Sequence, residues 1–186
     1  DRYIRECILE PLRLEDSWIG IPGERIAGYG ERIGVLYVKE DGKLNPHPKW
    51  NTAEAIAACR PGSNARGPIR ELGMFYETLL RARSAPALSL LRPDTVQHLT
   101  RAHRVGLFDH TFRHTLDWGL GFLVDSKRYG ASTVPYGYGS HASDQTFGHS
   151  GSQSSCAFAD PVNALVVAWM CNGQPGEPLH QKRARE

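Results

Sequence analysis

The sequence predicts an α+β domain in which an antiparallel sheet packs against helices. Residues 146–152, followed by residues 155–161 and 164–173, are typical of strands joined by a tight turn. Residues 67–81 instead repeat apolar side chains at helical spacing. The chain has no internal repeat, low-complexity tract or linker, so residues 1–186 are expected to form one domain.

The helix over residues 67–81 is the best-defined element. Gly67 can serve as its N-cap and Pro68 as its first helical residue, because proline lacks an N–H that this position does not need. We expect the helix to end near Arg81. Its apolar face is predicted to contain Ile69, Leu72, Phe75, Tyr76, Leu79 and Leu80.

Shorter signals place the remaining elements. A helix already under way at Tyr3 stops before Pro11, and another begins at Pro93 and ends near His103. Glycines within residues 118–124 are expected where another backbone or a ligand comes close. Local composition further predicts a strand over 32–39, a helical turn over 53–58, a strand over 118–124 and a loop over 129–143.

Composition and charge exclude several classes of protein. The chain is 40% hydrophobic and 23% charged, as in ordinary globular domains. A net charge of +2 from 22 basic and 20 acidic residues gives no field that would favour nucleic acid. No apolar stretch approaches the roughly 20 residues needed to span a bilayer. The N-terminus lacks the charged, apolar and small-residue sections of a signal peptide, so the sequence does not indicate a cellular compartment.

The four cysteines are predicted to be free thiols. Their spacing fits neither a dense disulfide framework nor a C-x-x-C metal pair. A turn at residues 160–163 would place Cys156 opposite Val167 and Cys171 opposite Ser152, which brings no two cysteines together. They are Cys7, Cys59, Cys156 and Cys171.

Several short segments occur in an order that resembles a known family. They are Glu10–Ser17, Arg60–Ser63 with the helix that follows it, Trp118–Phe122, and Phe147–Gly151 with Phe158–Pro161. Together they are similar to the C-terminal part of the β-lactamase-related serine hydrolases, which include class C β-lactamases, penicillin-binding proteins, esterases, D-aminopeptidases and acyltransferases. The resemblance covers nearly the whole chain and implies a β-lactamase/transpeptidase-like fold that is incomplete at its N-terminus.

The resemblance also implies a mechanism. The nucleophile of this family is the serine of an S-x-x-K motif, and a tyrosine, often in Y-x-N, shares the proton transfer. Neither motif occurs in this sequence. Both lie upstream of the matching region in the family, so the resemblance implies that a complementary N-terminal half supplies the nucleophile. It implies an ester or amide substrate, with no cofactor and no metal.

The element that remains is the family's K-T-G strand, represented here by His149, Ser150 and Gly151. Gly151 would let the strand edge approach a substrate without a Cβ in the way. The backbone N–H of Ser152 would be one of two oxyanion donors. His149 replaces an ammonium with an imidazole whose ordinary pKa is about 6.5, which favours esters or amides without an obligatory anionic group.

Four further residues are predicted to line a cleft, because loops flanking a catalytic strand commonly set specificity. They are Ser63 and Asn64 after the Pro61-Gly62 turn, and Tyr136 and Tyr138 in the glycine-containing loop. The competing interpretation is turn chemistry, since glycine, proline, serine and asparagine are what turns require.

Two other catalytic interpretations stay open. Residues 148–152 nearly match the G-x-S-x-G elbow, in which Ser150 would be the nucleophile at a strand-to-helix turn. His110 and His114 would share one face of a helix beside Asp109 and could bind zinc, although no glutamate base lies between them. Taken alone, the Gly-His-Ser-Gly run could also be the end of a strand whose histidine makes its hydrogen bonds within the fold and has no catalytic role.

A non-enzymatic interpretation is also open. A chain with half of a catalytic apparatus could be an inactive scaffold, an interaction protein, or a fragment that pairs with its other half. Its first helix is expected to lack a cap, and residues 178–186 are expected to open a helix that stops early. Such a fragment would expose sheet edges and apolar helix faces that must be covered.

Overall fold

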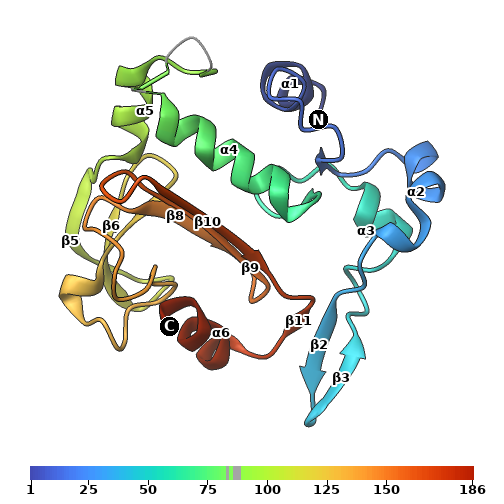
Figure 1. Cartoon of the computed structure of the whole chain (residues 1–186). Coiled ribbons are helices and arrows are strands. Elements are labelled where there is room, and N and C mark those ends of the chain that lie inside the picture. The colour runs from blue at the N-terminus through green and yellow to red at the C-terminus, as the bar shows by residue number, and fades with distance from the viewer. Residues whose placement is uncertain (83, 86–88) are drawn as a thin grey trace.

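A computed structural model describes residues 1–82, 84–85 and 89–186. Its centre is a six-stranded antiparallel sheet in the order β10-β9-β8-β7-β6-β5 (Figure 1). Its strands are β5 (Arg104–Asp109), β6 (His114–Trp118), β7 (Leu123–Val124), β8 (Phe147–Gly151), β9 (Ser155–Asp160) and β10 (Leu165–Met170). The predicted α+β fold with an antiparallel sheet is confirmed.

Helices cover both faces of this sheet. Helix α4 (Ile69–Arg81) packs on one face, where Tyr76 and Leu79 join Phe147, Ala157 and Ala159 in a buried cluster. Helix α6 (Glu177–Arg185) lies on the opposite face (Figure 1). Side chains alternate along the strands, so β8 and β9 supply both layers. The second cluster consists of Leu116, Leu123, Val134, Tyr138, Cys156 and Phe158.

Smaller elements surround the sheet. Helix α5 (Pro93–Thr100) leads into β5, and β1 (Trp18–Ile19) pairs with β4 (Ala65–Arg66). The chain also forms α1 (Arg2–Ile4), a π-helical turn (Arg5–Leu9), α2 (Gly23–Tyr29), α3 (Ala53–Ala57) and 3-10 turns at Gly30–Arg32 and Lys127–Tyr129. A three-stranded sheet combines β2 (Tyr37–Glu40), β3 (Lys43–Pro46) and β11 (Gly173–Gln174), with β11 parallel to β2.

Most of the predicted helices are present, with shifted ends. Pro68 is the N-cap of α4, because its ψ of 138° is extended, and Ile69 is the first helical residue. Helix α5 ends at Thr100 and not near His103, since Arg101 is also extended. The predicted turn at 53–58 is α3. Asp1 caps α1 by accepting a hydrogen bond from the Arg2 amide, so the predicted uncapped helix is wrong.

Two predicted strands are corrected. Residues 118–124 are not one strand: they contain the last residue of β6, a turn and the two residues of β7. A 2.8 Å hydrogen bond from the Gly119 amide to the Phe122 carbonyl closes the turn. Gly121 has φ = +92° there, a conformation that favours glycine. The strand predicted over residues 32–39 starts only at Tyr37, because the chain forms a 3-10 turn up to Arg32.

The register of the β9–β10 hairpin also differs from the prediction. Asp160 pairs with Leu165, which places Trp169 and not Val167 opposite Cys156. The loop is longer than expected because the Asp160 carboxylate accepts hydrogen bonds from the amides of Val162 and Asn163. All four cysteines are free thiols, as predicted.

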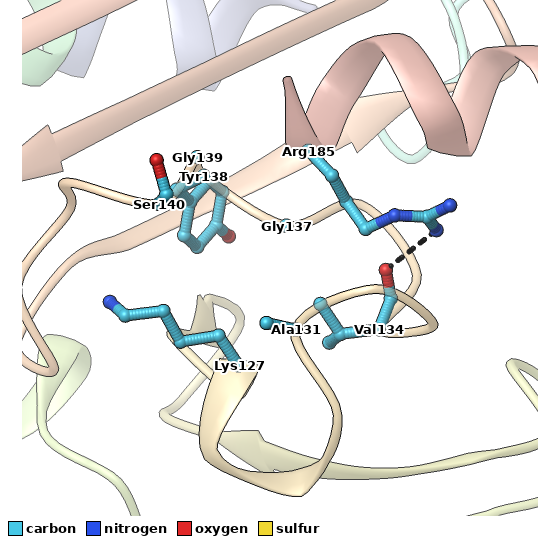
Figure 2. A pocket seen from close by; sticks show the side chains of 8 residues that line it. All are labelled: Lys127, Ala131, Val134, Gly137, Tyr138, Gly139, Ser140 and Arg185. Carbon is cyan, nitrogen blue, oxygen red and sulfur yellow. Dashed lines mark hydrogen bonds between the residues drawn. The ribbon is translucent and has the colours of Figure 1, made fainter.

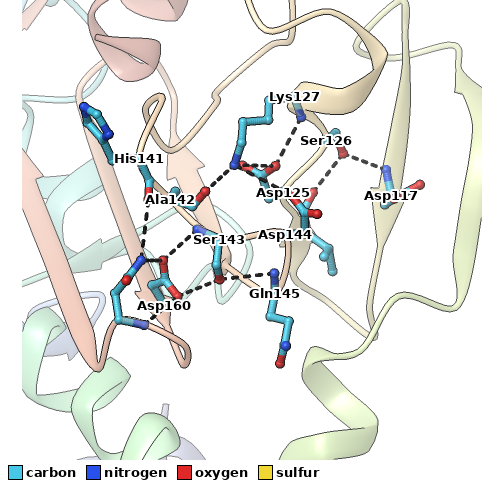
Figure 3. Close-up of polar contacts among 12 residues, drawn as sticks. Asp117, Asp125, Ser126, Lys127, His141, Ala142, Ser143, Asp144, Gln145 and Asp160 are labelled. Atoms are coloured by element: carbon cyan, nitrogen blue, oxygen red, sulfur yellow. Dashed lines mark hydrogen bonds and ion pairs between the residues drawn. The ribbon is translucent and has the colours of Figure 1, made fainter.

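Asp160 also connects this hairpin to the loop that precedes β8 (Figure 3). Its buried carboxylate accepts hydrogen bonds from the Ser143 amide at 2.8 Å, the Ser143 hydroxyl at 2.7 Å and Asn163 Nδ2 at 2.8 Å. Burial alone would raise the pKa of Asp160, but the hydrogen bonds from Ser143 and Asn163 outweigh it and hold the pKa well below its usual value. The ionised carboxylate therefore fixes where β8 begins.

We predict that Asp160→Asn lowers the free energy of unfolding at pH 7 by about 1–3 kcal/mol, because charge-assisted hydrogen bonds are lost in a buried site. A carboxyl whose pKa is depressed on folding contributes stability above about pH 4, and this contribution is lost as the pH falls toward the folded-state pKa. The difference between the variant and the wild type should therefore shrink at pH 3. Urea unfolding at both pH values measures this difference.

Asp144→Asn is the matched control, since the Asp144 side chain is 81% exposed and should contribute little at either pH. An Asp160→Asn defect of equal size at pH 7 and pH 3 would contradict the assigned role of the ionised carboxylate.

Candidate active site

The edge of β8 that faces β7 is only partly paired. Strand β7 has two residues, which pair with Phe147 and Gly148. The Asp125 amide donates to the Thr146 carbonyl at 2.8 Å, so alternation directs the backbone groups of Gly148 and Ser150 toward the β7 side. Among the described residues, no strand pairs with β8 on this side beyond Gly148. The second half of β8 thus has an open edge.

Ser152 follows this open edge and is exposed to solvent. It lies in the turn between β8 and β9, where the left-handed Gln153 (φ = +53°) reverses the chain. Within the described part of the chain, the Ser152 amide donates no hydrogen bond, while its carbonyl accepts one from Gln174 Nε2 at 2.9 Å. A free, exposed backbone N–H can stabilise an oxyanion.

His149 lies at the same edge with an exposed side chain. Its Nδ1 is 2.8 Å from the Ser150 carbonyl oxygen. Because a carbonyl oxygen only accepts hydrogen bonds, Nδ1 carries the proton, and Nε2 of the neutral ring is left with a lone pair. In this tautomer the imidazole presents an acceptor at Nε2, whereas a lysine in this position would present a cation.

An aromatic side chain supports the imidazole. The ring centroids of Trp118 and His149 are 5.6 Å apart. Trp118 Nε1 donates to the Asp109 carboxylate at 3.2 Å, and Arg104 pairs with the same carboxylate at 2.9 Å. Hydrogen bonds from the Phe112 amide and Arg104 hold the pKa of Asp109 below its usual value, so this carboxylate is ionised at neutral pH.

Ser150 is directed away from this arrangement. Its side chain lies on the α6 face beside Cys156, and Oγ is buried without a hydrogen-bond partner among the described residues. Burial raises the pKa of the Cys156 thiol to about 11, so this thiol is neutral. The chain after Ser150 turns into β9 and opens no helix, so the interpretation of residues 148–152 as a nucleophile elbow is wrong.

Comparison with known proteins identifies the family. A family model described as Beta-lactamase matches residues 1–186. This chain belongs to the beta-lactamase family. It is 25% identical to the putative D-alanyl-D-alanine carboxypeptidase of Escherichia coli K12 in an alignment of 191 positions, which covers 96% of this chain but 41% of that protein.

Solved structures with the beta-lactamase fold superpose on nearly all of the chain. EstCE1, described as a hydrolase with promiscuous acyltransferase activity, has a TM-score of 0.69 at 18% identity and matches 98% of this chain and 49% of its own. A penicillin-binding protein homolog from Caulobacter crescentus has a TM-score of 0.66 at 24% identity, with 99% and 50% covered. The chain therefore spans about half the length of these relatives, and the predicted β-lactamase/transpeptidase-like fold is confirmed.

Among the described residues, none of the hydrogen bonds of the four predicted cleft residues joins them to His149, and their role in a cleft stays a prediction. Asn64 is buried, and its Nδ2 donates to the carbonyls of Ala55 at 2.8 Å and Ala58 at 2.7 Å, so it holds a loop together. Ser63 is an exposed residue of the same turn. The Tyr136 hydroxyl donates to Glu177 of α6 at 2.5 Å. The positions of Ser63 and Asn64 are explained by the turn that they form.

Tyr138 lines a cavity of about 60 Å³ between the loop after β7 and α6. Its hydroxyl donates to the Leu123 carbonyl at 2.9 Å. Figure 2 shows the charged ends of Lys127 and Arg185 directed out of this cavity, and Arg185 donates to the Val134 carbonyl. None of the lining residues belongs to β8. The cavity is therefore separate from the open strand edge.

The histidine pair proposed as a zinc site does not lie on a helix. His110 is in the turn between β5 and β6, and His114 is the first residue of β6. His114 is engaged by the Thr115 carbonyl and the Thr133 hydroxyl. The described residues contain no group of three or more side chains placed to hold a metal ion. The helical geometry on which that hypothesis depended is wrong.

Sequence reasoning missed Trp118, Asp109 and Gln174 as neighbours of the strand edge. Trp118 ends β6 directly before the turn that limits β7, so a glycine-rich turn next to an aromatic residue was the available signal. Gln174 carries no such signal, because only its side-chain hydrogen bond to the Ser152 carbonyl connects it to the strand edge.

Among the described residues, no helix has the length and apolar character needed to cross a bilayer.

Two glycines of β8 should differ in what they tolerate. A Cβ at Gly148 would lie 2.3 Å from the Ala157 carbonyl oxygen and 2.7 Å from Phe158 Cβ, so backbone would have to move. A Cβ at Gly151 would lie 2.4 Å from Ser155 Oγ, a side-chain atom that can rotate away. We predict that Gly148→Ala lowers the free energy of unfolding by about 1–3 kcal/mol and Gly151→Ala by less than 1 kcal/mol. Chemical denaturation of both variants measures this, and an equal loss in both would contradict the assigned contacts.

Proposed function

We propose that this chain is part of a serine hydrolase that acts on an ester or amide through an acyl-enzyme. The observation that carries the proposal is the backbone N–H of the exposed residue Ser152, which has no hydrogen-bond partner among the described residues and follows the open edge of β8. It would donate to the oxyanion of the tetrahedral intermediate. Removing one such donor typically costs about 10²–10³ in rate.

The other catalytic groups are assigned by their chemistry. Gly151 would keep the edge free of a Cβ where the acyl carbonyl approaches, and His149 would present Nε2 to the substrate or leaving group. Ser150 would have a structural role, since its hydroxyl lies beside Cys156 on the face of the sheet that α6 covers. The nucleophile would come from a complementary segment with an S-x-x-K motif, whose serine amide supplies the second oxyanion donor. In this proposal residues 1–186 form one partial domain.

The substrate would be a small ester or amide. Relatives of this chain are described as a putative D-alanyl-D-alanine carboxypeptidase and as a hydrolase with acyltransferase activity. An imidazole in place of a lysine ammonium at position 149 favours substrates without an obligatory carboxylate. The proposed chemistry uses no cofactor and no nucleic acid.

An inactive scaffold is the second candidate function. The observation that favours it is the sequence itself, in which no serine is followed by lysine three residues later. In that case the open edge of β8 would have a structural or binding role only, and the protein would form no acyl-enzyme with any ester.

We predict that the purified 186-residue chain does not turn over 4-nitrophenyl esters. Ser150 faces away from the edge, and among the described residues no hydrogen bond joins the Ser152 hydroxyl to a general base that could activate it. The protein translated from the whole coding sequence around this chain should be labelled by a fluorophosphonate, and the labelled serine should belong to an S-x-x-K motif. Mass spectrometry of the labelled peptide identifies it.

Either of two results would contradict this assignment. Turnover by the isolated chain would show that it holds its own nucleophile. Absence of labelling in the translated protein would favour the scaffold.

A further inference from the structure

The carbonyl groups nearest the free Ser152 amide already have partners. His149 Nδ1 donates to the Ser150 carbonyl at 2.8 Å, and Gln174 Nε2 donates to the Ser152 carbonyl at 2.9 Å. By alternation, the Ser150 carbonyl is the one that faces the open side of β8. The Ser152 N–H is therefore available to a ligand, while the Ser150 and Ser152 carbonyls already accept hydrogen bonds from His149 and Gln174.

This arrangement is unsuited to a peptide-like ligand. An extended peptide that adds to a strand edge exchanges hydrogen bonds in both directions, so it must donate its own N–H groups to strand carbonyls. Here such an N–H would have to displace or share the partners of Ser150 and Ser152. An acyl group without an amide N–H has no such requirement and still accepts from the Ser152 amide.

Both side chains that engage the carbonyls are held in place. Trp118 packs beside the His149 ring and is itself bonded to the ionised Asp109. Gln174 is only 8% exposed, and its strand pairs with β2 through the Gln174–Val38 register. Moving either group would break contacts outside the strand edge, so the partners of the two carbonyls are built into the fold.

We infer that His149 and Gln174 make this edge selective for simple acyl esters over esters whose acyl group carries an amide N–H. This inference rests on the proposed function and narrows its substrate class. Each displaced hydrogen bond should cost roughly two- to ten-fold in kcat/KM, the range expected from net hydrogen-bond contributions. Trp118 and Asp109 act here as positioning residues, because they reach the edge only through His149.

The ring proton of His149 provides a test that does not depend on activity. We expect long-range ¹H–¹⁵N spectra of the 186-residue chain at pH 8 to show protonated Nδ1 and unprotonated Nε2 for His149, assigned by the loss of its signals in His149→Gln. Trp118→Ala should shift His149 toward a mixture of tautomers. His141, an exposed histidine whose ring has no hydrogen bond among the described residues, is the internal control. Protonated Nε2 at His149 in the wild type would overturn the inference.

Kinetics in the protein translated from the whole coding sequence test selectivity. The matched substrates are 4-nitrophenyl 4-oxopentanoate and 4-nitrophenyl N-acetylglycinate, whose acyl groups differ only in a CH2 group that replaces the amide N–H. We expect the ratio of their kcat/KM values to favour the 4-oxopentanoate, and Gln174→Leu to reduce the ratio two- to ten-fold. Gln145→Leu, at an exposed glutamine, should leave it unchanged.

The outcomes separate the two proposals. Fluorophosphonate labelling together with a preference for the N-acetylglycinate ester, or an unchanged ratio in Gln174→Leu, would overturn the inference and leave the hydrolase assignment standing. If no serine is labelled, the hydrolase assignment fails, and with it the inference that rests on it.

Discussion

The short length of β7 is the constraint on which the candidate site depends. Gly119 and Phe122 close a turn that brings the chain back only at Leu123, so β7 pairs with Phe147 and Gly148 and no further. A Cβ at Gly119 would lie 2.4 Å from the Leu99 carbonyl oxygen, which fixes this turn against the end of α5. Were β7 two residues longer, its backbone would cover Ser150 and the edge of β8 would be closed.

The rest of the fold keeps this edge in place. On one face, Phe147 of β8 packs against Tyr76 of α4 with ring centroids 6.4 Å apart. On the other, Ser150 lies opposite Cys156 under α6. Strand β9 pairs with β8 over its whole length, and Asp160 holds the loop before it. One side of β8 is thus rigid while the other remains available, as a site formed by a strand edge requires.

Sequence reasoning located this strand but could not describe its surroundings. The helices at 69–81 and 93–100 follow from local capping and apolar spacing, so they could be predicted to within a few residues. The strand predicted over residues 118–124 is wrong because a run of aromatic residues and glycines fits both a strand and a turn, and the close approach of Gly119 to the Leu99 carbonyl favours the turn. The β9–β10 register depends on hydrogen bonds to the Asp160 side chain, which spacing does not reveal.

The residues of the candidate site also differ in whether the sequence alone could identify them. His149, Gly151 and Ser152 are adjacent in sequence, and a motif could therefore identify them. Trp118 and Gln174 meet them through contacts of their side chains, and the burial of Asn64 and Tyr138 depends on which carbonyls their side chains reach. Residues placed by local structure were accessible to prediction, whereas residues placed by tertiary contacts were not.

Amide hydrogen exchange of the 186-residue chain measures the openness of the β8 edge most directly. We expect the amides of Ser150 and Ser152 to exchange at nearly the rate of an unstructured chain. The amide of Gly148, which faces β7, and the amide of His149, which faces β9, should be protected. Protection of the Ser152 amide equal to that of Gly148 would show that this N–H has a partner, and the proposed oxyanion donor would be lost.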